Sequence, residues 1–119
     1  MRVIIVEPNK RPRIADIECS LESMQKVVGG YIEAIYLYEE PVALVCNEEA
    51  KLEGLPLNRA LRDADGDVVD IIAGTFFIAG LTEDDFGSLS DEHAELFLAR
   101  FERPEQFLLF GNKVVVLPL

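Results

Sequence analysis

The apolar positions of the chain fall into short runs separated by turn residues, a pattern that predicts short strands joined by tight connections. Arg2 to Val6 is a β-branched run that ends before Pro8, which indicates a first strand. Ile14 and Ile17 predict a second short extended piece. Tyr31 to Tyr38 is rich in β-branched and aromatic residues and predicts a third strand.

The central part of the chain predicts buried strands around one long loop. Val42 to Cys46 is almost entirely apolar, so we expect it to form a hairpin with Tyr31–Tyr38 and to be buried on both faces. The segment from Asn47 to Arg59 contains glycine, proline and charged residues and predicts a long loop. Val68 to Leu81 is the longest apolar stretch, and Gly74 and Gly80 indicate a bulge or a close backbone approach within it.

Two helices are expected, and each has a serine N-cap followed by an acidic residue in the first turn. Ser20 begins the first and Gly29-Gly30 ends it, whereas Ser90 begins the second and Pro104 ends it. Their apolar faces are Leu21, Met24, Val27 and Val28 in the first helix, and Ala94, Phe97, Leu98 and Phe101 in the second. Between them, Thr82 to Asp85 predicts a brief helical turn.

The last segment predicts a closing hairpin, with strands Phe107–Phe110 and Lys113–Leu117 joined by Gly111-Asn112. Hairpins interrupted by two helices favour an α+β fold with a mainly antiparallel sheet of about five to seven strands. The length of 119 residues predicts a single domain, 1–119.

The charge of the chain narrows the classes of partner. The net charge is −11, which argues against direct nucleic-acid binding and against anionic membranes. Residues 1–30 contain five basic and four acidic residues, and the remainder contains six basic and eighteen acidic residues, a balance of −12. The acidity therefore begins after Gly30.

The two cysteines, Cys19 and Cys46, form no CxxC motif and no metal-ligand set. Because the N-terminal apolar run is too short for a signal peptide, we expect a cytoplasmic protein with free thiols. Cys19, near a helix N-terminus, could have a lowered pKa, although an inert thiol is the favoured interpretation for both cysteines.

Other chemistry-bearing residues point first to ordinary structural roles. Asp63, Asp65 and Asp67 suggest a calcium loop, but Val68 and Gly74 stand where the glycine and the glutamate of an EF-hand are required. The only histidine, His93, is expected at the helix surface. No catalytic residue, metal or cofactor is predicted, so an enzymatic activity is not expected.

Two charged segments leave alternatives open. Asn58, Arg59 and Arg62 interrupt the acidic part of the chain and could bind an anion or form salt bridges with Glu48 and Glu49, the latter being favoured. The acidic run from Glu83 to Glu95 could present phosphate-like charges, although a solvated surface is the favoured interpretation. Carboxylates such as Glu39, Glu40 and Glu53 allow an acid–base pair, but their spacing is not fixed by the sequence.

Three stretches resemble the domain of unknown function 3846 family. They are Val28-Gly29-Gly30-Tyr31-Ile32-Glu33-Ala34, Asn47-Glu48-Glu49 running to Gly54-Leu55-Pro56-Leu57-Asn58-Arg59, and Asp70-Ile71-Ile72-Ala73-Gly74-Thr75-Phe76-Phe77. The resemblance implies a genomic context of gut Gram-positive bacteria, phages and conjugative elements, and it implies no activity. Ala50 stands where the family often has glycine, which puts a tight turn there in doubt.

The leading functional hypothesis is a non-enzymatic interaction module encoded by a mobile element or its host. Its predicted binding residues are Asn47, Glu48, Glu49, Asn58 and Arg59. One alternative is an acidic DNA mimic that inhibits a restriction or defence enzyme. Another is a small enzyme or ligand-binding domain that uses the 47–59 loop. The expected partner is a host or mobile-element protein, and an edge strand in Ile71–Ile78 could also pair two copies into a homodimer.

Overall fold

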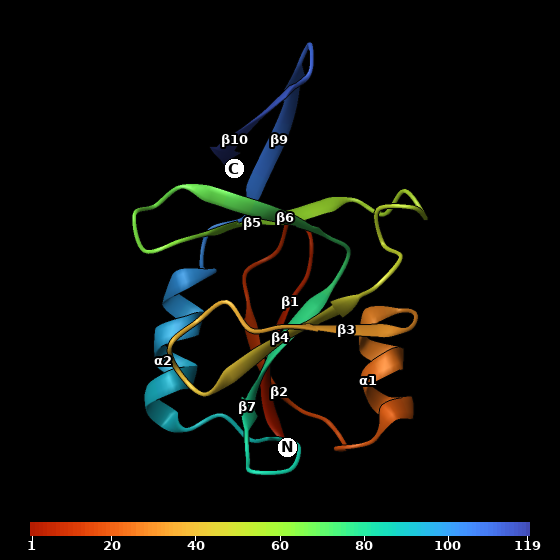
Figure 1. Ribbon diagram of the computed structural model, residues 1–119, viewed down its shortest axis with the longest axis vertical. Coiled ribbons are helices and arrows are strands. Elements are labelled where there is room, and N and C mark those ends of the chain that lie inside the picture. The colour runs from red at the N-terminus through yellow and green to blue at the C-terminus, as the bar shows by residue number, and fades with distance from the viewer.

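The computed structural model describes all residues from 1 to 119 and contains ten strands and two helices (Figure 1). In chain order these are β1 Arg2–Val6, β2 Arg13–Asp16, α1 Leu21–Val28, β3 Ile32–Ile35, β4 Val42–Asn47, β5 Leu57–Arg62, β6 Val68–Ala73, β7 Phe76–Leu81, β8 Phe86–Gly87, α2 Asp91–Arg100, β9 Glu105–Phe110 and β10 Lys113–Pro118. Neither helix is long and apolar enough to cross a membrane.

The strands form one large sheet and two separate hairpins. The large sheet has the order β2-β1-β7-β4-β3, and β8 joins β7 as its sixth strand. β5 pairs only with β6, and β10 pairs only with β9. Every strand pair is antiparallel. The α+β fold is confirmed, and the six-stranded sheet lies within the expected range of strand number.

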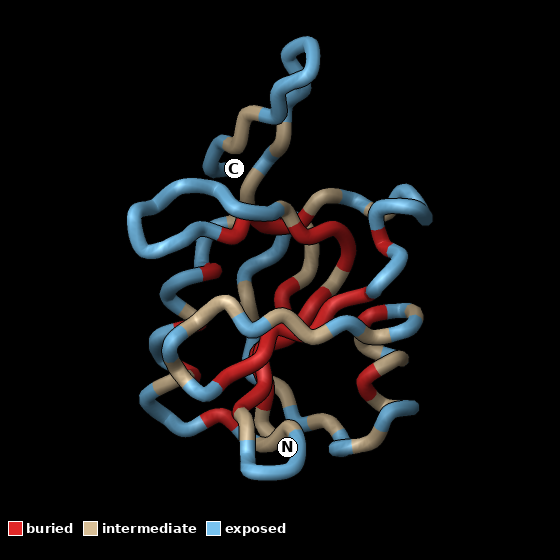
Figure 2. The backbone as a smooth tube through the Cα atoms, viewed as in Figure 1, coloured by how far each residue is buried: buried red, intermediate tan, exposed pale blue.

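The two helices cover opposite faces of the large sheet. Because side chains alternate along a strand, the odd and even residues of β1, β4 and β7 enter two different cores. Met24 and Val28 of α1 pack in one core, and Phe97 of α2 and its C-cap residue Phe101 pack in the other. The central strands are thus buried on both faces, and Figure 2 shows buried residues in red along them.

Local sequence determines where both helices begin, as predicted. The Ser20 hydroxyl accepts a hydrogen bond from the Ser23 N–H, and the Ser90 hydroxyl accepts one from the His93 N–H. Helix α1 ends at Gly29, whose φ of 80° lies in the left-handed region. The capping patterns were therefore sufficient to place both helices.

The stretch from Val68 to Leu81 is two strands, not one strand with a bulge. Gly74 has a φ of 74° and makes a turn that separates β6 from β7. β6 then pairs with β5, whereas β7 lies between β1 and β4 at the centre of the sheet. The prediction of an edge strand over Ile71–Ile78 is therefore wrong for its β7 part.

Two further connections differ from the predictions. Thr82 to Asp85 forms the turn of the β7–β8 hairpin, not a helical turn, and the Thr82 N–H donates to the Asp85 carbonyl at 2.8 Å. The close approach expected at Gly80 is confirmed, because a Cβ there would lie 2.5 Å from the Ser88 carbonyl oxygen. The predicted 47–59 loop is shorter at both ends, since Asn47 closes β4 and β5 begins at Leu57.

Candidate functional site

Asn47 lies at the corner where β4 ends, and its side chain is buried. Its Nδ2 lies 3.4 Å from both the Val28 carbonyl and Glu53 Oε1, and its Oδ1 accepts a 2.9 Å hydrogen bond from the Glu49 N–H. These contacts tie the end of α1 to the turn that follows β4. The Asn47 amide thus organises the corner, with Glu48 and Glu49 exposed beside it.

Gly30 makes room for this amide. A Cβ at Gly30 would lie 2.9 Å from Asn47 Nδ2, closer than nonbonded atoms approach. A small cavity of about 230 Å³ opens next to it, lined in part by Tyr31, Asn47 and Glu49. The corner therefore offers one buried amide and two carboxylates of the turn, Glu49 and Glu53, to a small polar group.

Asn58 and Arg59 lie inside β5 and are fully buried. The Asn58 amide donates to the carbonyls of Val6 and Gly74 at 2.9 and 2.8 Å. The Arg59 guanidinium donates to the Phe101 carbonyl from Nε and Nη2, to the Asn58 carbonyl and Oδ1 from Nη1, and to the Lys10 carbonyl from Nη2. All five guanidinium N–H groups can be engaged in this way.

This network explains why a charged side chain sits in the core. The Phe101 carbonyl lies at the C-terminal end of α2, where the helix dipole favours a positive charge. Burial lowers the pKa of Arg59, and nearby Glu105 acts in the opposite direction. The favoured salt bridges of Arg59 with Glu48 and Glu49 are not formed, because the guanidinium turns to backbone carbonyls instead.

The structure does not bring the five predicted binding residues into one place. Asn47, Glu48 and Glu49 line cavities at the end of β4, whereas Arg59 lines a different one. Their role in binding stays a prediction. The side-chain donors of Asn58 and Arg59 are already used within the chain.

The largest groove, of about 830 Å³, lies between the β3–β4 connection, β5, the end of α2 and the base of the β9–β10 hairpin. Its walls hold charges of both signs: Arg59, Arg62, Arg100 and Arg103, and Glu39, Glu40, Asp63, Glu102 and Glu105. Several are engaged with each other. Arg62 Nη2 lies 2.9 Å from Glu105 Oε2, and Glu105 Oε1 accepts from the Ala60 N–H, which fastens the hairpin base to β5.

A further contact in the groove joins α2 to the β3–β4 connection. The Arg100 guanidinium stacks on the rings of Tyr38 and Phe97, at 4.7 and 5.0 Å from their centroids. Burial raises the pKa of Tyr38, against the opposing charge of Arg100. None of the carboxylates in the groove is fully buried. The donors of Arg59 are taken up by the Phe101, Lys10 and Asn58 acceptors, so this arginine presents none of them to the groove.

The C-terminal hairpin, residues 105–118, has a different character from the rest of the chain, which we call the body, residues 1–104. Every residue from Leu108 to Val114 is exposed, and no residue of β9 or β10 joins either core. Leu109 is 76% exposed and Phe110 is 62% exposed. The hairpin projects beyond β5 and β6 as an arm of the molecule (Figures 1 and 2).

Comparison with protein families finds one match: the family described as Domain of unknown function (DUF3846) matches residues 1–102. The chain belongs to this family. Comparisons with curated proteins and with solved structures find no match. The matched segment ends before β9, so the exposed hairpin lies outside it.

The three stretches that resemble the family meet in the fold. Gly30 of the first packs on Asn47 of the second, and Leu55 of the second lies 3.0 Å from the Cβ position of Gly74 in the third. The Ala50 N–H reaches the Asn47 carbonyl at 3.3 Å, so the turn in doubt is present with alanine. The three stretches therefore contact one another within the body.

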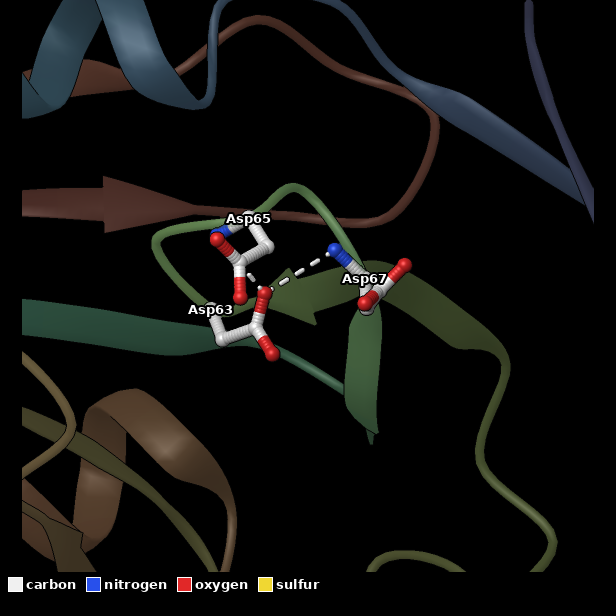
Figure 3. A group of neighbouring side chains, drawn as sticks. All are labelled: Asp63, Asp65 and Asp67. Carbon is white, nitrogen blue, oxygen red and sulfur yellow. Dashed lines mark hydrogen bonds between the residues drawn. The ribbon is translucent and has the colours of Figure 1, made fainter.

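Asp63, Asp65 and Asp67 form a cluster of three neighbouring carboxylates at the β5–β6 turn (Figure 3). Asp63 Oδ1 accepts hydrogen bonds from the N–H groups of Asp65 and Asp67 at 2.9 and 3.0 Å, as the dashed lines show. All three side chains are exposed. The hydrogen bonds of Asp63 account for the shape of this turn.

The remaining sequence candidates lie apart from these places. Cys46 is buried in β4, and its burial together with nearby acidic groups raises its pKa to about 11, so its thiol stays protonated. Cys19 is exposed near the Phe86 carbonyl. The acidic run is divided between the β7–β8 turn and α2, where Asp91 pairs with Arg2.

The amino-acid sequence predicts the C-terminal hairpin but not its exposure. The signal was the absence of alternation: FLLF and VVVL are continuous apolar runs on both strands. Such runs are typical of strands covered on both faces.

Proposed function

We propose that this chain is a non-enzymatic protein-interaction module and that its C-terminal hairpin is the docking element. The observation that carries the proposal is the exposure of large apolar side chains on a projecting hairpin: Leu108, Leu109, Phe110, Val114 and Leu117 are each between 38 and 76% exposed. Large apolar side chains gathered on an exposed element mark sites of association in folded proteins.

The physical argument has two steps. A two-stranded hairpin without a third strand or a covering layer is marginally stable in water. Burying one leucine or phenylalanine side chain contributes roughly 1.5–3 kcal/mol, so a partner that covers the arm gains free energy and also orders it. A protein partner is favoured over an anionic membrane, because the chain carries a net charge of −11.

Context supports a cytoplasmic partner encoded by the host or by a mobile element. Both cysteines are free thiols, as expected in a reducing compartment. The family context implied by the sequence resemblance points in the same direction. The groove and the Asn47 corner then belong to the body that holds the arm in place.

The test uses a matched pair of leucines, one on the arm and one on the body. Leu109 is 76% exposed on β9, and Leu52 is 89% exposed in the turn after β4. A partner captured by the full chain is identified, purified and titrated against wild type, Leu109→Asp and Leu52→Asp. We expect Leu109→Asp to weaken binding at least tenfold and Leu52→Asp to leave it unchanged.

Equal binding by the three proteins would overturn the proposal. Circular dichroism of each variant shows that the fold is intact, since neither leucine contributes to a core. Binding of the wild type to vesicles of anionic phospholipid, abolished by Leu109→Asp, would replace the protein partner with a membrane and would also overturn it.

A further inference from the structure

The C-terminal hairpin is apolar on both of its faces. The register pairs Leu109 with Val114 and Phe107 with Val116, which places these four side chains on one face. It pairs Leu108 with Val115, and these lie on the opposite face together with Phe110 and Leu117, whose partners Lys113 and Gln106 are the polar residues at the two ends of that face. In a half-exposed antiparallel sheet one face would be polar.

A second copy of the chain does not satisfy this arrangement. Two hairpins stacked face to face cover one face of each and leave the other in water. Pairing edge to edge extends the sheet and covers neither face. In either case two bodies that each carry a charge of −11 must approach one another.

The groove of the chain itself does not fit the hairpin either. Its walls present four arginines and five carboxylates, and burying apolar strands against them would desolvate those charges. The covering surface must be apolar, and neither the groove of the body nor a second copy of the chain supplies it.

We infer that the hairpin inserts into an apolar cleft of a partner protein that covers both of its faces, and that the rim of this cleft is basic. The inference rests on the proposed docking through the hairpin and adds the shape and charge of the partner. Within residues 105–118 the charges of Glu105 and Lys113 cancel, so the body carries the whole net charge of −11. Inserting the neutral arm brings the body to the rim, and because carboxylates outnumber cations in the body as a whole and by five to four in the groove at the hairpin base, positive charge on the rim is complementary.

The experiment probes the two faces separately in the full chain. A photo-reactive phenylalanine analogue replaces Leu109 on one face, Phe110 on the other, or Leu52 on the body as the control. All three side chains are more than half exposed, so the replacements leave the cores intact. Each protein is irradiated in a lysate of the source cell, and adducts are identified by mass spectrometry and then reconstituted with the purified partner.

We expect one protein to be cross-linked from Leu109 and from Phe110 and not from Leu52. With the purified partner, its association rate should fall about tenfold between low and physiological salt because opposite charges are screened. Cross-linking from one face only would show a flat contact: the docking function would stand and the cleft would be overturned. A salt-independent rate would overturn the basic rim.

Two other outcomes decide the remaining alternatives. An adduct with a second copy, or a dimer in sedimentation that Leu109→Asp dissolves, would overturn the inference in favour of self-association. Absence of any adduct beyond the Leu52 control at both positions would overturn the proposed docking function itself.

Discussion

Strands β4 and β10 have similar sequences and opposite surroundings. β4 reads VALVCN and is buried at every position, whereas β10 reads KVVVLP and is buried at none. β4 lies between β3 and β7 with a helix on each face of the sheet, and β10 has β9 as its only neighbour. An apolar run therefore predicts that a strand should be covered on both faces, but its neighbours decide whether it is.

The body and the C-terminal hairpin therefore differ in how their apolar side chains are covered. The body supplies its own covering layers, and its buried polar groups find partners within the chain. The strands of the hairpin are as apolar as the central strands, but no helix or sheet of the chain covers them.

The same substitution should have very different costs in the two strands. Leu44→Ala in β4 should lower the free energy of unfolding by about 3–5 kcal/mol, because Leu44 is fully buried and a cavity remains. Leu109→Ala in β9 should change it by less than about 0.5 kcal/mol, because that side chain faces solvent. Urea unfolding measures both. A cost for Leu109→Ala close to that of Leu44→Ala would show that the hairpin is part of the core.

Arginines on neighbouring parts of β5 should differ in the same way. Arg59→Ala should lower stability by about 3 kcal/mol, because it leaves the carbonyls of Phe101 and Lys10 without their donors in a buried place. Arg62→Ala removes an exposed ion pair with Glu105 and should cost under about 1 kcal/mol. Thermal unfolding at fixed pH compares the two variants. Equal losses would contradict the assignment of Arg59 as the buried cap of α2.

Substitutions at two glycines test whether a local change destabilises the whole fold or only its own region. Gly30→Ala should cost about 1–2 kcal/mol across the whole fold, since its Cβ would press on the Asn47 amide. Gly111→Ala strains a turn with a φ of 61° but meets no atom within 4 Å. It should speed amide exchange within β9 and β10 and leave global unfolding unchanged. Hydrogen exchange resolves the two, and faster exchange in β4 of Gly111→Ala would break the separation of the regions.

The rate of thiol labelling compares β4 with β10 and should show the smallest effect on the protein near neutral pH. In a Cys19→Ser background, Cys46 should resist Ellman's reagent at pH 8, because its pKa is raised to about 11 by burial. A Val114→Cys variant should add one readily labelled thiol on β10, because that side chain is exposed. Rapid labelling of Cys46 at a rate like that of the β10 thiol would show that β4 opens as easily as the arm.

The same pKa shift gives a pH dependence with a definite sign. In the unfolded chain a thiol ionises near 9, whereas in the folded protein Cys46 holds its proton to about 11. Unfolding then releases a proton between these values, so the contribution of Cys46 to stability is present below pH 9 and is lost as the pH rises through 11. A Cys46→Ala variant should lack this part of the alkaline decline.

Local signals predicted much of the fold. The caps at Ser20 and Ser90, the stop at Gly29 and the terminal hairpin all depend on contacts within a few residues, and the structure confirms them. The division at Gly74 was missed because an apolar run is continuous in sequence, whereas its two halves join different sheets. For the candidate site, the sequence predicts a loop at Asn58 and Arg59 because these polar residues closely follow Gly54 and Pro56 in a charged segment. Their burial depends on the carbonyls of Val6, Lys10 and Phe101, which accept their hydrogen bonds and are distant in sequence.

Short-range hydrogen bonds and side-chain periodicity are written in the amino-acid order, and they indicate most of the secondary structure, just as the composition gives the acidic charge and three stretches indicate the family. Which apolar strands are covered follows from the tertiary structure instead. It placed α1 and α2 on opposite faces of one sheet, buried a charged arginine among carbonyls, and left a hairpin with two apolar faces in solvent. The physical reason is that burial depends on neighbours brought from distant parts of the chain, and β9 and β10 receive almost none.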